Sequence, residues 1–427
     1  MSTLFENCRI LTPAGVITGF LGVEGKYIDY VGETRPAKAY DKVRNFTGRL
    51  MMPAFVNAHT HTPMTLLRGV GSDLSLQEWL FGKVFPIEDR LTAEDINVGS
   101  RLAALEMLSC GTGSFTDMYF FPEETARVAL ESGMKANLCR PVQSFDPAER
   151  GEDSARIAQA LDLYNAFNGA GEGRILVDFC VHAEYTCTEP VTKYLADIVR
   201  ERQGNLHVHL SETKKEHEDC VKKYGKTPAR WFADLGAFDC GAFCAHCVWV
   251  TEEDMDLFLE KGVSVVHNPT SNMKLGSGFA PIQRMLDKGI NVALGTDGAA
   301  SNNNLNMAEE LHLAGVIHNG YTGDPTVMKP MDLIKMATLS GAVLQRRYDT
   351  GTLEAGKRAD ICCVSLESPH MQPDLDTAAL VAYSMQASDV KLTMVDGKVL
   401  YENGQFLTLD KDRILYDVSK TVKRLYS

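Results

Sequence analysis

The chain has 427 residues, of which 44% are hydrophobic and 23% are charged, and its formal net charge is −13. This is the composition of a soluble globular protein, and the acidic balance argues against nucleic acid or an anionic membrane as a partner, because both attract basic surfaces. No apolar run reaches the ~18 residues that suggest a membrane span, and the first residues lack the pattern of a signal peptide. The 11 scattered cysteines are typical of buried thiols in a reduced cytoplasm. We therefore expect a cytoplasmic protein.

Both ends of the chain are rich in β-forming residues. Short apolar segments, separated by glycine, proline or charged turns, recur before residue 52 and again after residue 351. Because chain termini commonly lie close together at a domain surface, we expect the two ends to pair into one small sheet domain. The predicted strands are 4–11, 19–23, 27–31, 43–46, 359–365, 390–395 and 398–401.

The middle of the chain alternates strand and helix patterns about eight times, which predicts an α/β fold with a parallel sheet. Helices are expected to begin at capping residues such as Thr92 and Thr251 and to end at Gly111 and Gly262. Eight such units favour a (β/α)8 barrel. A doubly wound open sheet is the alternative, but no glycine-rich phosphate turn follows the first strand. The predicted strands are 55–58, 113–117, 135–138, 175–181, 206–210, 242–246, 263–267 and 291–294.

Histidines gather where these strands end, and seven of the chain's 11 histidines lie there. Side chains alternate faces along a strand, so His59 and His61 point to the same side. A carboxylate, Asp297, follows the last strand, and imidazole and carboxylate groups at one barrel mouth predict a metal site. The seven histidines are His59, His61, His182, His207, His209, His246 and His267.

The fifth strand carries two histidines on one face. We assign His209 to the metal because it is nearer the barrel mouth, and we expect the deeper His207 to be structural. Glu212 lies three residues beyond His209, just past the strand end. His217 is expected on a solvated helix face, and the remaining three histidines lie away from the strand ends: His312, His318 and His370.

With these residues assembled, the chain resembles the amidohydrolase superfamily, and in particular its mononuclear deaminase and chlorohydrolase branch. The resemblance implies a (β/α)8 TIM-type barrel over residues 53–350 and a small β-sandwich formed by residues 1–52 and 351–427. The stretches that carry it are Pro53-Ala-Phe-Val-Asn-Ala-His59-Thr-His61, His209-Leu-Ser-Glu212, Ala245-His246-Cys247, 267–276, Gly295-Thr-Asp297-Gly-Ala-Ala-Ser301-Asn302 and 351–360.

Within that branch the chain is most similar to the S-adenosylhomocysteine/5′-methylthioadenosine deaminases, which act on adenosine-type purines. The segments 61–69, 73–80 and 85–89 and the tripeptide Asp117-Met-Tyr119 carry this similarity. Two alternatives remain. A sibling enzyme would act on another aminated or chlorinated ring, such as guanine, a pterin or a triazine. A non-catalytic assembly protein on the same scaffold would be expected to have lost metal ligands.

The resemblance implies one divalent metal held by His59, His61, His209 and Asp297. Zn²⁺ suits these ligands best, although Fe²⁺, Co²⁺, Ni²⁺ or Mn²⁺ also binds such sites. Binuclear relatives carry a lysine at the end of the fourth strand, whereas 175–181 contains none. Glu212 is the expected proton shuttle, with helix capping as its alternative role. His246 and Asp297 are expected to hold and deprotonate the attacking water.

For substrate recognition, the resemblance implies that Glu88 binds ribose hydroxyls and that His182 and Glu212 contact the purine. Trp79 is expected to pack against the substrate. Arg140 and Arg156 are expected to pair with the amino-acid carboxylate of S-adenosylhomocysteine, although Arg156 also fits a solvated helix arginine. Asn302 is expected only to shape its turn. The resemblance also allows a homo-oligomer.

Overall fold

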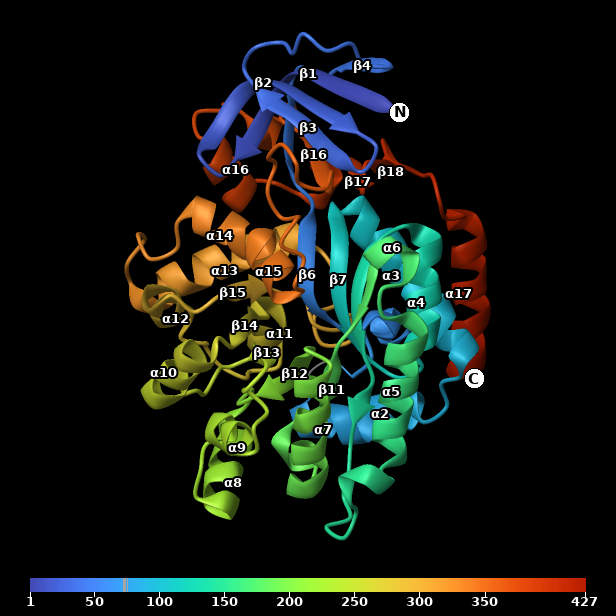
Figure 1. Ribbon diagram of the computed structural model, residues 1–427, viewed down its shortest axis with the longest axis vertical. Helices are drawn as coiled ribbons and strands as arrows, with labels where there is room; N and C mark the ends of the chain where they lie inside the picture. The colour runs from blue at the N-terminus through green and yellow to red at the C-terminus, as the bar shows by residue number, and fades with distance from the viewer. Residues whose placement is uncertain (72–73, 75) are drawn as a thin grey trace.

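The terminal segments form one mixed sheet of nine strands. The computed structural model describes residues 1–71, 74 and 76–427. Ser72, Asp73 and Ser75 lie outside the described residues, and the last two belong to the 73–80 segment. The strands run in the order β19-β18-β17-β16-β5-β1-β2-β3, and β4 pairs with β1 (Figure 1). Their bounds are β1 (Ser2–Thr12), β2 (Gly15–Glu24), β3 (Tyr27–Gly32), β4 (Lys42–Asn45), β5 (Arg49–Pro53), β16 (Ile361–Ser365), β17 (Val390–Val395), β18 (Lys398–Glu402) and β19 (Gln405–Phe406).

The two ends of the chain meet where β5 and β16 pair antiparallel, with Ile361 opposite Pro53. Alternate residues of these strands, such as Met51 and Cys363, turn into a small apolar core that also takes in Phe5 and Leu21. The residues between them, such as Met52 and Cys362, pack into the main core, so both faces of the sheet are covered here. The terminal sheet therefore has its own core at one end of the molecule (Figure 1).

The middle of the chain forms two parallel sheets. One has the order β10-β8-β7-β6, and the other has the order β15-β14-β13-β12-β11-β9. Their strands are β6 (Phe55–Thr60), β7 (Thr112–Met118), β8 (Lys135–Cys139), β9 (Pro141–Val142), β10 (Ile175–Val177), β11 (Phe179–Val181), β12 (Asn205–Leu210), β13 (Gly241–His246), β14 (Ser264–His267) and β15 (Val292–Leu294).

One predicted strand, 175–181, is divided at Asp178. Its first half pairs with β8 in one sheet, and its second half pairs with β9 and β12 in the other. The buried Asp178 carboxylate accepts a hydrogen bond from Asn137 Nδ2 at 2.7 Å and lies 2.5 Å from Arg346 Nη2, so it cannot continue the apolar pattern. The break therefore lies where the chain passes from one sheet to the next.

The outer strands β6 and β15 also approach each other. Thr60 and Asp297 form an isolated parallel bridge, and the Asp297 backbone N–H donates to the His59 carbonyl at 3.0 Å. Asn57 binds Thr296 through both its side-chain oxygen and its nitrogen. The first strand of the middle segment, β6, therefore lies beside the segment that follows the last strand, β15.

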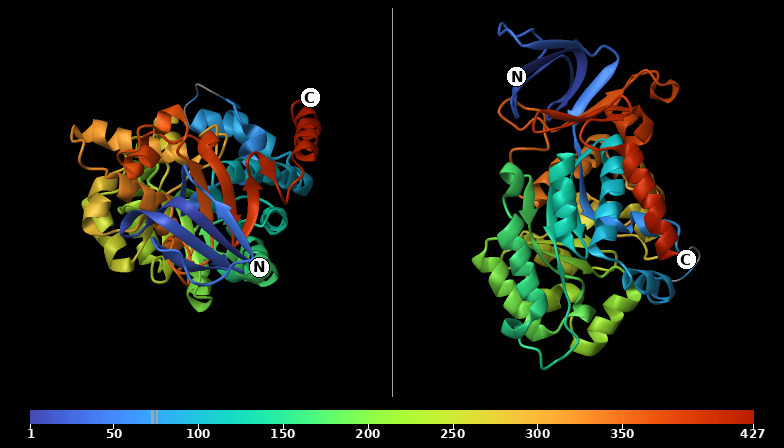
Figure 2. Two further views of the ribbon diagram at one scale, coloured as in Figure 1. Left: turned by 90° about the horizontal axis from the view of Figure 1, so that it is seen from above. Right: turned by 90° about the vertical axis from the view of Figure 1, so that its right-hand side faces the viewer.

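Helices cover the outside of the parallel strands (Figures 1 and 2). The longer ones begin at the expected caps: Thr92 and Thr251 each form a reciprocal capping box, with Asp95 and Asp254 respectively. The principal helices are α3 (Ala93–Ser109), α4 (Pro122–Ser132), α5 (Ala155–Phe167), α7 (Glu189–Glu201), α8 (Lys214–Tyr224), α9 (Pro228–Asp234), α10 (Glu252–Lys261), α12 (Ile282–Lys288), α13 (Met307–Thr322), α14 (Pro330–Ala337) and α15 (Leu339–Leu344). Among the described helices, none combines the length and the apolar character that crossing a bilayer requires.

The region after residue 351 is less β-rich than its sequence pattern predicts. It contains α16 (Thr377–Tyr383) and the long α17 (Lys411–Leu425). Residues Ile414, Thr421 and Leu425 face inward from α17, which packs on α3 instead of on the terminal sheet. Arg424 also pairs with Asp95 at the start of α3. The C-terminal helix therefore lies along the flank of the parallel-strand region (Figure 2).

Candidate metal and active site

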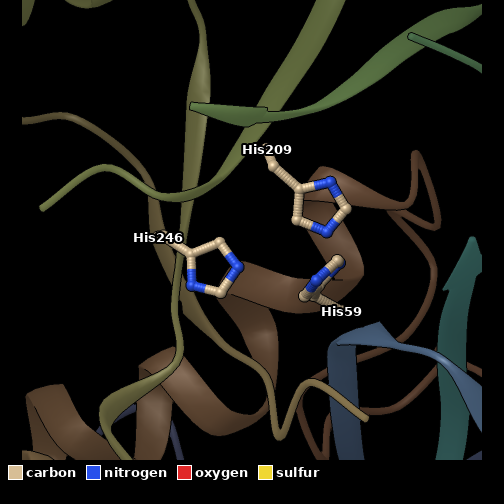
Figure 3. Close-up of side chains that lie close together, drawn as sticks. All are labelled: His59, His209 and His246. Carbon is tan, nitrogen blue, oxygen red and sulfur yellow. The ribbon is translucent and has the colours of Figure 1, made fainter. Parts of the chain in front are cut away.

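Three buried histidines from three strands turn their rings toward one another (Figure 3). They are His59 on β6, His209 on β12 and His246 at the end of β13. The ring centroid of His59 lies 4.8 Å from that of His209 and 5.6 Å from that of His246. Since all three strands end at the same edge of the parallel sheets, side chains far apart in sequence converge there.

His61 and Asp297 complete the cluster. Asp297 Oδ1 lies 3.4 Å from His59 Nε2 and 3.1 Å from His61 Nε2. Ser271 and Ser301 donate hydrogen bonds to the other carboxylate oxygen, at 2.6 and 2.8 Å. The carboxylate is therefore held with one oxygen directed at the imidazoles.

The backbone at the cluster is strained. Asp297 has φ 62° and His246 has φ 71°, a left-handed region that residues with a side chain seldom adopt. Such conformations persist where the surrounding structure fixes them, and they concentrate at functional sites. Here the left-handed conformations direct the His246 and Asp297 side chains toward the cluster, where their strands end.

The imidazole tautomers favour a bound cation. His61 Nδ1 lies 2.6 Å from the Met118 carbonyl, and His209 Nδ1 lies 3.0 Å from the His182 carbonyl. A carbonyl only accepts hydrogen bonds, so both Nδ1 atoms carry hydrogen. The two Nε2 atoms then face each other at 3.3 Å, with lone pairs available for a metal.

His59 has a different neighbour behind it. His59 Nδ1 lies 3.0 Å from His207 Nε2, and His207 Nδ1 lies 3.7 Å from Cys139 Sγ. In the described part of the chain, the buried His59 Nε2 has no hydrogen-bond partner. An unpartnered buried nitrogen beside a carboxylate and two further imidazoles fits a divalent metal with nitrogen and oxygen ligands.

The electrostatics of the cluster also favour a positive charge. Burial lowers the pKa of His61, but the hydrogen bond to Asp297 and its charge outweigh burial and raise that pKa to about 9. Burial lowers the pKa of His59 to about 4, despite the opposing effect of Asp297. Burial alone would raise the pKa of Asp297, whereas the neighbouring His59 and His61 imidazoles hold it well below the usual range. One positive charge, a proton or a metal, is thus favoured among these groups.

Glu212 and His246 form an acid–base pair beside the cluster. Glu212 Oε2 lies 3.8 Å from His246 Nε2, and Ser277 Oγ donates to Glu212 Oε1 at 3.3 Å. Burial raises the pKa of Glu212. Asn272 Oδ1 lies 2.9 Å from His246 Nδ1 and can accept its hydrogen. The cap of α8 is Thr213 and not Glu212, so the capping alternative is wrong and Glu212 remains directed toward the site.

Glu88 and His182 approach the same cluster. Glu88 ends α2 (Phe85–Glu88) and accepts a 2.5 Å hydrogen bond from Tyr119, whose ring lies 6.2 Å from that of His61. Burial raises the pKa of Glu88. The His182 ring lies 4.6 Å from His209, and its Nδ1 has no partner among the described residues. Both side chains therefore have polar atoms close to the histidine cluster.

Three other predicted substrate residues are differently placed. The Trp79 indole is buried in an apolar cluster with Met64 and Leu67, and it donates to the Val70 carbonyl at 2.9 Å. Arg140 Nη2 binds both oxygens of Glu123, at 2.7 and 2.8 Å. Arg156 is exposed on α5. Among the described residues, none of the three forms a hydrogen bond or ion pair with the histidine cluster.

Two residues at strand ends serve the scaffold. His267 Nε2 lies 3.0 Å from His318 Nε2 of α13, and among the described residues His267 belongs to neither group of side chains that could hold a metal. Asn302 donates to the Thr296 carbonyl at 2.8 Å and thereby shapes the turn, as expected. Sequence reasoning gave no role to Tyr119, although its place just after β7 puts it at the same sheet edge.

Comparison with known proteins agrees with this geometry. The Amidohydrolase family profile matches residues 50–400. The chain is 44% identical to a 5-methylthioadenosine/S-adenosylhomocysteine deaminase of Caldanaerobacter subterraneus subsp. tengcongensis, covering 100% of this chain and 99% of that protein. It is 38% identical to a 5′-deoxyadenosine deaminase of Methanosarcina mazei, covering 99% and 98%. The crystal structure of an adenosine deaminase from Xanthomonas campestris with bound zinc superposes with a TM-score of 0.95 at 31% identity, covering 99% and 98%. The chain belongs to the amidohydrolase family.

Proposed function

We propose that the protein is a metal-dependent hydrolytic deaminase of adenosine-type purines, releasing ammonia and the inosine counterpart. The observation that carries this proposal is the Glu212–His246 pair, 3.8 Å apart, beside the buried cluster of His59, His61, His209 and Asp297. Relatives named as deaminases of methylthioadenosine, S-adenosylhomocysteine and 5′-deoxyadenosine cover the whole chain, which supports the same substrate class.

The two parallel sheets are proposed to close into one (β/α)8 barrel over residues 53–350. The contacts of β6 with the segment after β15, together with the divided strand 175–181, whose two halves lie in different sheets, support this closure. The terminal segments 1–52 and 351–427 would form a β-sandwich beside it, apart from α17, which packs on α3.

The proposed cofactor is one divalent metal, with zinc the best match to three imidazoles and a carboxylate. His59, His61, His209 and Asp297 would hold it. When bound, such a metal lowers the pKa of a water ligand toward about 7 and so provides hydroxide at neutral pH. The orphaned His59 Nε2 and the facing nitrogens of His61 and His209 support this assignment.

The proposed reaction forms a C–O bond at the amino-bearing carbon and breaks its C–N bond. Asp297 and His246 orient the attacking water and remove its proton. Glu212 delivers a proton to the adjacent ring nitrogen, and burial, which raises its pKa, favours the protonated form that this step needs. His246, close to Glu212, then stabilises the oxygen of the tetrahedral intermediate. The proton removed from the attacking water passes to the amino nitrogen, which leaves as ammonia, and the remaining hydroxyl proton returns to Glu212 as the product carbonyl forms.

Substrate recognition is proposed to rest first on Glu88 and His182. Tyr119 holds Glu88 Oε1, so Oε2 remains to accept a ribose hydroxyl. The unpartnered His182 Nδ1 would contact the purine. Arg140 and Arg156 would meet a carboxylate on the 5′ substituent, and Trp79 would support the loop behind the substrate instead of touching it. The chain is also proposed to be cytoplasmic, to bind no nucleic acid or membrane, and to form a homo-oligomer.

The Glu88 assignment separates a nucleoside deaminase from a sibling acting on guanine, a pterin or a triazine, because a bare ring offers no ribose hydroxyls. We expect Glu88→Ala to raise the Michaelis constant for 5′-methylthioadenosine by about tenfold or more, the loss of one hydrogen bond to a charged group. Initial-rate kinetics of ammonia release measure this. Asp89→Ala, at the neighbouring exposed position, is the control. An unchanged Michaelis constant in Glu88→Ala would remove the ribose contact.

A further inference from the structure

A second pair of carboxyl groups, one buried and one partly buried, lies behind the proton shuttle. Glu184 begins the short helix η4 (Glu184–Thr186), two residues after His182, and Glu216 lies in the first turn of α8. Glu184 is 2% exposed, and its Oε2 has no partner among the described residues. The helix η4 packs against α8, which brings the two carboxyl groups together. The catalytic scheme above uses neither residue.

Glu216 fixes the backbone that carries Glu212. Its Oε1 accepts a 2.6 Å hydrogen bond from the Ser211 N–H, and its Oε2 accepts a 2.8 Å bond from the Glu212 N–H. Ser211 has φ 46°, a left-handed conformation that needs such support. The carboxylate of Glu216 therefore determines how Glu212 leaves the end of β12.

Glu184 belongs to a segment that also fixes His209, one of the proposed metal ligands. The His182 carbonyl accepts from the His209 backbone N–H at 2.9 Å and faces His209 Nδ1 at 3.0 Å. The segment 182–184 thus contacts His209 at one end and Glu216 at the other. It connects the residue expected to touch the purine with the loop that carries the shuttle.

Two carboxylates cannot both be ionised at such close range in a buried setting, so one of them must carry a proton. Burial, with the charge of Glu216, raises the pKa of Glu184. Burial and the charge of Glu212 raise that of Glu216, but three backbone N–H groups favour its ionised form. These backbone contacts favour Glu184 as the carboxyl that carries the proton. The other titratable groups facing the pair are Lys223 and Cys220 of α8, Tyr185 of η4 and Glu212 itself.

We propose that Glu184 is a positioning residue, and that its protonated carboxyl bonds to Glu216 and thereby ties the His182 segment to the Glu212 loop. The inference rests on the proposed deaminase function for its kinetic readout. Its structural readout is independent of that function.

The test compares Glu184→Leu, Glu184→Gln and Glu216→Gln with the unmodified zinc-loaded enzyme. Leucine removes the donor, so kcat for 5′-methylthioadenosine should fall by about tenfold or more, the scale of a small misplacement of a catalytic group. Glutamine at 184 still donates to Glu216, so this variant should retain kcat at neutral pH. In Glu216→Gln the side-chain NH2 group replaces one oxygen that accepts from the Ser211 or Glu212 N–H, so one of these hydrogen bonds is lost. We therefore expect kcat to fall while zinc is retained. The exposed Glu218→Gln, on the same helix, is the matched control.

The alkaline side of the pH profile gives a second readout. As pH rises and the shared proton is lost, the two carboxylates repel and the unmodified enzyme should lose kcat. Glu184→Gln has only one carboxylate there, so its alkaline limb should lie at a higher pH by one unit or more. Identical profiles for the two proteins would overturn the proposal.

Hydrogen–deuterium exchange of peptides covering 182–186 and 205–217 tests the connection without any substrate. Faster exchange of both segments in Glu184→Leu, but not in Glu184→Gln, is the expected result. If the unmodified enzyme deaminates no nucleoside, the proposed function fails and the exchange experiment still decides this inference. Unchanged exchange and unchanged kcat in Glu184→Leu would contradict it.

Discussion

At the scale of single residues, the site depends on which atom each polar group turns to its neighbour. Glu212 is partly buried and close to His246, but Ser277 and His246 are its only hydrogen-bonding or ionic side-chain partners among the described residues. The ligand cluster, in contrast, is fixed from behind by the Met118 and His182 carbonyls and by Ser271 and Ser301. Rigid ligands beside a less constrained carboxyl suit a site where one group must move a proton.

Glu212→Gln should separate proton transfer from metal binding. The amide has almost the same shape but cannot transfer a proton, so turnover should fall by about 10²-fold or more, whereas zinc content should not change. Ammonia release and metal analysis of the purified variant measure the two quantities. The exposed Glu218→Gln controls for the loss of one negative charge. A near-normal rate in Glu212→Gln would show that another group moves the proton.

The residues that sequence could identify are those whose place follows from strand ends. Strand-end positions were enough to group His59, His61, His209 and Asp297 at one barrel mouth, whereas their assignment as the ligand set came from the family resemblance. The same reasoning over-counted His267, because only the fold shows that His318 of α13 binds its ring. Tyr119, Ser271 and Glu184 escaped prediction because their roles depend on partners distant in sequence.

At the scale of elements, helix caps were predictable and strand breaks were not. A capping box needs only residues three positions apart, so Thr92 with Asp95 and Thr251 with Asp254 could be identified from sequence. The break at Asp178 depends on Asn137 and Arg346, which come from other elements. The helix α17 was not predicted, because the whole segment 351–427 was interpreted as β-rich from the strands at its beginning.

The cap of α10 gives a test at this scale. Thr251 Oγ1 accepts from the Asp254 N–H at 3.2 Å, and Asp254 Oδ2 accepts from the Thr251 N–H at 2.9 Å. Thr251→Ala should lower the free energy of unfolding by about 1 kcal/mol and leave turnover unchanged. Urea denaturation measures the change, with Thr251→Ser as the control that keeps the hydroxyl. Equal losses for alanine and serine would mean that the hydroxyl does not stabilise the helix.

At the scale of the whole molecule, one buried lysine joins the parallel strands to the terminal sheet. Lys135 begins β8 and is 1% exposed. Its Nζ lies 2.5 Å from Asp360 Oδ2 and 2.8 Å from Asp396 Oδ1, on the segments that flank β16 and β17. Arg358 also binds Asp396, at 3.1 Å. The two parts of the molecule therefore share an ion-pair network away from water.

Lys135→Met should destabilise the protein by about 3–5 kcal/mol, because it leaves two buried carboxylates without their main partner. Thermal unfolding monitored by circular dichroism should show a clearly lower midpoint. Lys38→Met is the matched control, since Lys38 also binds two carboxylates, at 2.6 Å each, but on an exposed surface of the same sheet. A midpoint change no larger than that of Lys38→Met would show that the buried network does not join the two parts.

The measurement that tests the central claim most directly is ammonia release by the zinc-loaded protein. The substrates would be S-adenosylhomocysteine, 5′-methylthioadenosine, adenosine, adenine and guanine, with chelated protein and Asp297→Asn as controls. The proposed function predicts release from the nucleosides, and little or none from the bare bases, the chelated protein or the variant. Release from guanine alone, release from no compound, or full activity after chelation would contradict it.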